Sequence, residues 1–261
     1  MRNLLRANLW YWTHSVPIWF AFGISAILGA VTGLTAIHRS DRLPDTMLFI
    51  PQYGFTVLAL LLFLACLVLL AGKTHKMTDA HRKLLAGYSR TVLCISEMLT
   101  AAYLACIAAL LNFSVMLVCG RDFWEYLHPN GVLIGAVCLI TAYVTAAVCT
   151  ELLIFATENP PLNMMILFVC IPLLVLGSDA AMNLNDSRNL FLRLLYFGNI
   201  ISPIERSFST VICNSINGLT GEFMGNIDTS YRLYTMLSYQ LVLLAGCLLT
   251  AAVIYRKKQI K

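Results

Sequence analysis

The chain has 261 residues, of which 59% are hydrophobic and only 12% charged, and its mean hydropathy is +0.76. These values exclude a water-soluble domain and indicate a protein that crosses a membrane several times. The net charge of +5 comes from basic residues on one side of the expected membrane, so it gives no reason to expect a nucleic-acid partner.

Residues 1–16 are predicted to form a helix that lies along the inner membrane interface. Apolar side chains recur on one helical face of this segment at Leu5, Leu9, Trp12 and Val16. Trp10, Tyr11 and Trp12 would then lie at the depth of the lipid headgroups. No small-residue cleavage site follows, which argues against a signal peptide, and a frayed terminus is the alternative to the interfacial helix.

Six apolar stretches follow, and each is long enough to span a bilayer. A span needs roughly 20 mainly apolar residues to cross a hydrocarbon core of about 30 Å. The stretches are 17–37, 48–72, 91–119, 132–156, 162–178 and 236–255, and the fifth is the shortest and contains Pro172. Because only helices or closed barrels satisfy the backbone in lipid, and these runs are too long for barrel strands, we predict an all-α fold in a single transmembrane domain over 1–261.

The distribution of charge predicts the orientation of the chain. With six spans both termini lie on one side, which carries 11 of the 18 Lys and Arg residues in short segments, whereas nine of the 13 acids lie on the other side. By the positive-inside rule, both termini are therefore expected in the cytosol of a multi-pass protein of the plasma membrane.

The first span carries small residues on one face. Ala21, Ser25, Gly29 and Gly33 recur every four residues, and small residues at this spacing let another helix approach closely in lipid. The partner helix belongs either to a second copy of the chain, which we favour, or to the same chain.

Residues 73–90 are a long polar run between two apolar spans. Apolar side chains fall on one stripe of a short predicted helix at Met77, Ala80, Leu84 and Tyr88. Thr78 is a suitable N-cap, Asp79 lies four residues before Lys83, and Gly87 can end the helix. The stripe favours a cytosolic docking surface, and the alternative is a basic hairpin that only fixes the topology.

The end of the second span resembles part of a phosphate-binding loop. Ala71-Gly72-Lys73-Thr74 matches its last residues, but Leu67 stands where the motif requires its first Gly. We therefore expect no ATP site, no cofactor and no catalytic residue in this chain. The nine cysteines are expected to behave as small apolar residues, and no C-x-x-C, H-E-x-x-H or His cluster supports a metal site.

The third and fourth spans each carry one acid, Glu97 and Glu151. Intramembrane acids are functional candidates because burying a charge in lipid is expensive. Both residues lie near the cytosolic ends of their spans, so the favoured interpretation is that they snorkel to the interface or pair with a nearby cation. The alternative is a polar contact that shapes a substrate entrance or a seam between helices.

Residues 179–235, between the last two spans, are too apolar for a solvated loop. Residues 190–201 and 203–216 are each apolar enough to embed in the membrane, yet too short to cross it. We predict that residues 188–216 form two short helices that dip in from the outer side, since irregular backbone is tolerated at that depth only where protein covers it.

This layout resembles the permease subunits of type-2 ABC exporters over nearly the whole chain. HRKLLAGYSRTVLCISEML is similar to the family's stretch from the coupling helix into the third span, IISPIERSF is similar to the segment before the outer helices, and the basic tail YRKKQIK follows the last span. Glu97 stands near a position where many members carry Lys. Small permeases that export amphipathic peptides, of the lantibiotic or phenol-soluble-modulin type, are the most similar in length and loop economy.

The resemblance implies an ATP-driven exporter that moves amphipathic or hydrophobic substrates out of the cell, such as toxin or antimicrobial peptides. It implies two copies of a cytosolic ABC ATPase, which hold the ATP and Mg²⁺, and a second permease copy in a homodimer. The residues that would couple the chain to the ATPase are Met77, Thr78, Asp79, Arg82, Lys83, Leu84 and Tyr88.

Two other classes of protein stay open. The main alternative is a polytopic receptor, sensor or scaffold that does not transport. A membrane-embedded enzyme is disfavoured because Glu97 and Glu151 have no His or Lys at catalytic spacing. A neighbouring gene for a soluble protein with G-x-x-x-x-G-K-[ST] would favour transport, whereas a lone gene would favour the alternatives.

Overall fold

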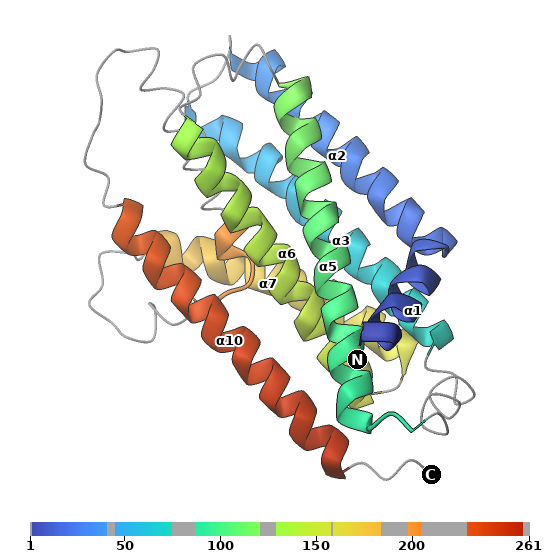
Figure 1. The fold of residues 1–261 in the computed structure, drawn as a ribbon. Helices are drawn as coiled ribbons and strands as arrows, with labels where there is room; N and C mark the ends of the chain where they lie inside the picture. Colours follow the sequence, from blue (N-terminus) through green and yellow to red (C-terminus); the bar gives the residue numbers. More distant parts are fainter. Residues whose placement is uncertain are drawn as a thin grey trace.

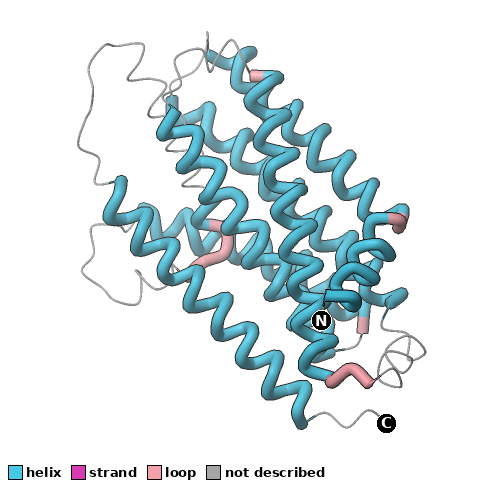
Figure 2. The backbone as a smooth tube through the Cα atoms, in the orientation of Figure 1, coloured by secondary structure: helices cyan, strands magenta, loops and turns pink. Residues whose placement is uncertain are grey.

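The computed structural model is a bundle of helices, and it describes residues 2–40, 45–74, 87–120, 129–157, 159–183, 198–204 and 229–257. Its long helices are α1 (Arg2–Thr13), α2 (Val16–Ser40), α3 (Asp45–Thr74), α5 (Arg90–Cys119), α6 (Pro129–Thr157), α7 (Pro160–Asn183) and α10 (Thr229–Lys257). Nearly all of the described chain is helical, as Figure 2 shows, and no strand occurs within it.

Six of these helices are long and apolar enough to cross a membrane, as the sequence predicts. Their apolar windows are Val16–Thr35, Tyr53–Leu70, Thr91–Cys119, Val132–Thr157, Pro160–Gly177 and Tyr234–Ala251. The start of α2 and the end of α10 lie at the same end of the bundle (Figure 1), as an even number of spans requires. Helix α7 itself continues through Pro172 to Asn183, beyond the end of the predicted fifth span at residue 178. The prediction of an all-α, multi-pass membrane protein is confirmed.

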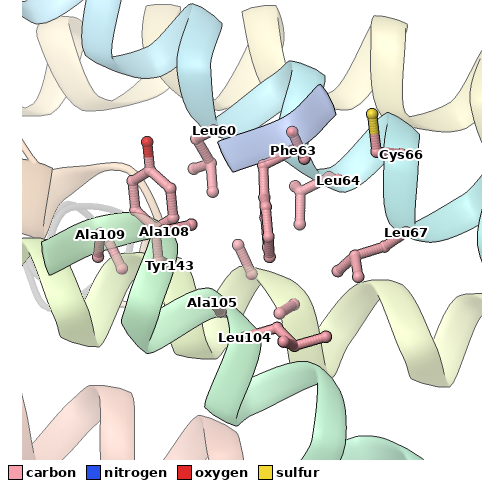
Figure 3. Close-up of a cluster of buried hydrophobic side chains, with 14 of the residues drawn as sticks. Leu60, Phe63, Leu64, Cys66, Leu67, Leu104, Ala105, Ala108, Ala109 and Tyr143 are labelled. Atoms are coloured by element: carbon pink, nitrogen blue, oxygen red, sulfur yellow. The ribbon is translucent and has the colours of Figure 1, made fainter. Parts of the chain in front are cut away.

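Helices α2, α3, α5 and α6 form the best-packed part of the bundle, which we call the frame. In α3, 67% of the residues in the apolar window are buried inside the protein. Figure 3 shows this core, where Phe63 of α3 lies near Tyr143 of α6 with ring centroids 6.0 Å apart. Ala105 and Ala108 of α5 are fully buried in the same cluster, and their small side chains let the helices pack closely.

Helices α7 and α10, together with residues 198–204, form a looser part of the bundle, which we call the flank. Only 17% of the residues in the apolar window of α7 and 22% of those in α10 are buried. Helix α7 packs mainly on α3, whereas α10 packs on α5 and α6. As far as the structure describes them, α7 and α10 make little contact with each other.

Helix α1 confirms a helix at the start of the chain, but its buried face differs from the predicted one. Leu4, Asn8 and Trp12 are buried, mainly against α5, whereas Val16 is 80% exposed and belongs to α2. Asn8 donates a hydrogen bond of 3.1 Å from its Nδ2 to the Oγ of Ser96 in α5. The apolar pattern missed this face because a buried asparagine interrupts it, and Trp12 is buried in the protein core.

Candidate functional site

The predicted coupling segment, residues 73–90, is described only at its two ends. Met77, Thr78, Asp79, Arg82, Lys83 and Leu84 all lie outside the described residues. Gly87 has a φ of 87°, a left-handed conformation that favours glycine and is typical of the residue that follows a helix. Ser89 then caps α5, because its Oγ accepts a hydrogen bond of 3.3 Å from the backbone N–H of Val92. With Tyr88 half-buried between these two residues, the segment enters α5 through a defined turn.

The small-residue stripe of α2 packs within the chain. Ala21 and Ser25 are fully buried, and a Cβ atom added at Gly29 would lie 2.5 Å from the backbone oxygen of Asn112 in α5. A Cβ atom added at Gly33 would also lie 2.5 Å from a backbone oxygen of α5. The two helices therefore approach as closely as glycine allows. The stripe is a helix-packing face, and the expectation that a second copy covers it is corrected, since α5 of the same chain occupies it.

Asn112 is the polar anchor of this contact, and the sequence analysis gave it no role. Its side chain is 1% exposed, and its Nδ2 donates a hydrogen bond of 2.8 Å to the backbone oxygen of Ser25 in α2. A polar side chain in the interior of a membrane protein needs a partner, because neither lipid nor an apolar core supplies one. An asparagine within an apolar span was thus the available signal for the α2–α5 contact.

Residues 198–204 connect α7 to α10 through buried polar contacts. The Nδ2 of Asn199 donates a hydrogen bond of 2.7 Å to the backbone oxygen of Leu174 in α7. The backbone oxygen of Asn199 accepts one of 2.9 Å from the Nε2 of Gln240 in α10. Ile201 and Ile204 are fully buried and pack into the core of the frame. These seven residues therefore lie inside the bundle, and the remainder of the predicted dipping segment, 188–216, lies outside the described residues.

The two intramembrane acids lie in the protein interior. Glu151 is 0% exposed and neither of its carboxylate oxygens has a hydrogen-bond partner, while Glu97 is 9% exposed. The two carboxyl groups and the thiol of Cys94 in α5 lie close enough to one another to interact electrostatically. The expectation that Glu151 snorkels to the interface is wrong, because protein covers its side chain on all sides. The pair instead forms part of the seam between α5 and α6.

A small apolar cluster surrounds this part of the seam and holds α10 in place. It consists of Cys94, Met98, Val148, Phe155, Cys247 and Ala251. The Sγ atoms of Cys149 in α6 and Cys247 in α10 lie 3.5 Å apart. All eight cysteines in the described chain are free thiols, so this contact is a packing contact between two helices and no covalent bond.

The residues described above form helix contacts and buried polar groups, and they do not form a metal site. Within the described residues, no set of three or more His, Cys, Asp or Glu side chains is placed to hold a metal ion. Comparison of the chain with known protein families, with curated proteins and with solved structures finds no match. The function is therefore argued from the spans, the packing and the buried polar groups.

Proposed function

We propose that this chain is the transmembrane subunit of an ATP-driven exporter that moves amphipathic or hydrophobic substrates, such as toxin or antimicrobial peptides, out of the cell. In this proposal a separate cytosolic ABC ATPase, present in two copies, supplies the energy, and two copies of the chain form the permease. The finer elements of the proposal are an interfacial α1, a coupling helix over residues 78–87 and an outer re-entrant hairpin within 179–235.

The observation that carries the proposal is the placement of residues 198–204. They precede the last span, yet Asn199 bonds to α7 and to α10, and Ile201 and Ile204 are buried in the core. A connecting segment that only joins two spans would be expected at the membrane surface. The burial of residues 198–204 between the last two spans supports the proposal that this region enters the membrane. In the proposal it closes the substrate path when no substrate is present.

The difference in packing between the frame and the flank supports a moving part. A substrate path needs two conformations, and the ligand that drives the change must bind one of them better than the other. In the proposal the ATPase acts on residues 78–87, which lead through Gly87 and Ser89 directly into α5 of the frame. The weakly buried α7 and α10 would then move against the frame and open the path.

Replacement of Leu84 with Asp tests this proposal. The change places a charge on the apolar stripe, so we expect the loss of co-purification with the proposed partner ATPase and of stimulated ATP hydrolysis, with normal membrane insertion. His75→Asp adds the same charge to the same segment off the stripe, and it should leave both properties intact. A Leu84→Asp variant that binds and stimulates like the wild type would contradict the coupling role. A wild-type chain that retains no ATPase would favour a receptor, sensor or scaffold.

A further inference from the structure

Glu151 is a buried acid that the proposed transport function does not use. Glu151 follows Val148 by three residues and precedes Phe155 by four, so all three lie on the same face of α6. Both of these residues belong to the cluster that joins α5, α6 and α10. The side chain of Glu151 is 0% exposed, and neither oxygen receives a hydrogen bond. An ionised carboxylate in this place would have lost its water without gaining any compensating donor.

The groups that face Glu151 make an ionised form still less favourable. Helix α5 contributes Glu97, whose carboxyl group repels a negative charge on Glu151, and the thiol of Cys94. The titratable groups in the neighbouring cluster are the thiols of Cys149 in α6 and Cys247 in α10. Arg2 and Arg6 lie on the exposed face of α1. Removing an ion from water costs several kcal/mol unless a partner of opposite charge compensates it.

The size of the site limits what can neutralise this carboxylate. Both oxygens are fully covered by protein, so no water-filled space adjoins them. A Mg²⁺ or Ca²⁺ ion needs about six oxygen ligands, and within the described residues no group of three or more His, Cys, Asp or Glu side chains is placed to hold a metal ion. A proton needs no cavity and converts the carboxylate into a neutral acid. We infer that Glu151 is a proton-binding site in the seam between α5, α6 and α10, and that it carries its proton in this conformation.

This site links a proton to the position of α10. The cluster that closes the seam includes Cys247 and Ala251 of α10, a helix with few other buried residues. Movement of α10 away from α6 would admit water, and the ionised form of Glu151 would then be solvated and the proton released. Binding and release of one proton would thus accompany the opening and closing of the seam. This inference holds whether or not an ATPase drives the movement.

Dicyclohexylcarbodiimide tests the inference on the full chain in lipid nanodiscs. This apolar reagent adds to protonated carboxyl groups in apolar surroundings, where it forms a stable N-acylurea, and it does not react with carboxylates in water. We expect mass spectrometry at neutral pH to locate the adduct at Glu151 in the wild-type chain. The label should be lost in Glu151→Gln and retained at residue 151 in the matched control Glu97→Gln. A wild-type chain that shows neither this adduct nor the infrared band of a protonated carboxylic acid would overturn the inference.

Infrared spectroscopy provides a second measurement that does not depend on reagent access. The wild-type spectrum at neutral pH should contain the carbonyl band of a protonated carboxylic acid, and the band should be lost in Glu151→Gln and kept in Glu97→Gln. If Glu151 is instead ionised and paired with a basic side chain, the band is missing from the wild type and the inference is wrong. The wild-type assignment by mass spectrometry decides the question if Glu151→Gln fails to fold.

The pH dependence of the folding stability is a third test of the proton site. The folded chain holds a proton that an unfolded chain releases at neutral pH, so the unfolded state binds fewer protons and stability should fall as the pH rises. This decline should be smaller in Glu151→Gln, whose amide holds no titratable proton. An equal pH dependence in the wild type and in Glu151→Gln would contradict the proton site.

Discussion

The frame and the flank of this bundle are held together by different means. In the frame, Gly29 and Gly33 of α2 bring two helix backbones into contact, and Asn112 adds a hydrogen bond across the same seam. In the flank, α7 and α10 rarely bury side chains, and the polar contacts of Asn199 bridge the space between them. The difference shows that apolar composition alone does not decide which helices pack tightly.

The physical reason lies in the solvent. Lipid is as apolar as a leucine side chain, so exposed residues such as Leu241 and Val242 of α10 need no protein partner. Association inside the membrane depends instead on close packing and on hydrogen bonds. The helices of the frame are packed more closely than those of the flank. The flank can therefore move against the frame at a lower cost in free energy, which is the property that an alternating transport path requires.

The frame should be sensitive to a change at Gly29. In a Gly29→Ala variant the new Cβ atom would lie 2.5 Å from the backbone oxygen of Asn112, so α2 must move away from α5. We expect a loss of about 1–3 kcal/mol in stability, measured as retention of monodisperse protein after heating in detergent. Gly23→Ala is the matched control, because no atom lies within 4 Å of its Cβ position. Equal stability of Gly29→Ala and Gly23→Ala would contradict the close contact between α2 and α5.

The flank should respond locally to the loss of Asn199. Asn199→Ala removes the hydrogen bond to Leu174 and leaves the backbone N–H of Ile201 without its acceptor, at a cost of about 1–3 kcal/mol. On a background with the native cysteines replaced, Ser202→Cys should be slow to react with a water-soluble thiol reagent, because residue 202 is 0% exposed. The reaction should become faster in Asn199→Ala.

The control for this experiment is Asn159→Ala, which removes an exposed asparagine from the turn between α6 and α7. This variant should leave the reactivity at residue 202 unchanged. Fast labelling at residue 202 in the otherwise unchanged chain would show that residues 198–204 are solvated, and the flank would then have no buried bridge.

A cross-link between α6 and α10 should have the smallest effect on stability, and it tests only whether these two helices are neighbours. The Sγ atoms of Cys149 and Cys247 lie 3.5 Å apart, so mild oxidation with copper phenanthroline should join α6 to α10 in a variant that keeps only these two cysteines. A protease site inserted between residues 205 and 228 lets a gel distinguish linked from unlinked halves. A variant with Cys149 and the exposed Cys170 of α7 should remain unlinked. Linkage of both pairs, or of neither, would contradict the packing of α10 on α6.

The six spans were predictable because long apolar runs have few other structures in a membrane. The close packing at Gly29 and Gly33 was also predictable from spacing, but the partner was not, since the same small residues suit a helix of the same chain or of another copy. Depth along a span misled the interpretation of Glu151: its place near the helix end predicts snorkelling, and only the surrounding helices show that the side chain is covered. Asn8 and Asn199 interrupt apolar patterns, and their partners lie far away in sequence.

The most direct test of the account is whether ATP moves the flank against the frame. Spin labels at the exposed positions Leu249 of α10 and Leu99 of α5 report on the flank, and labels at Ile27 of α2 and Leu110 of α5 report on the frame. With the proposed partner ATPase bound, addition of ATP and vanadate should change the distance between the flank labels and leave the distance between the frame labels unchanged. No change in the flank distance, or an equal change in the frame distance, would contradict an ATP-driven permease built in this way.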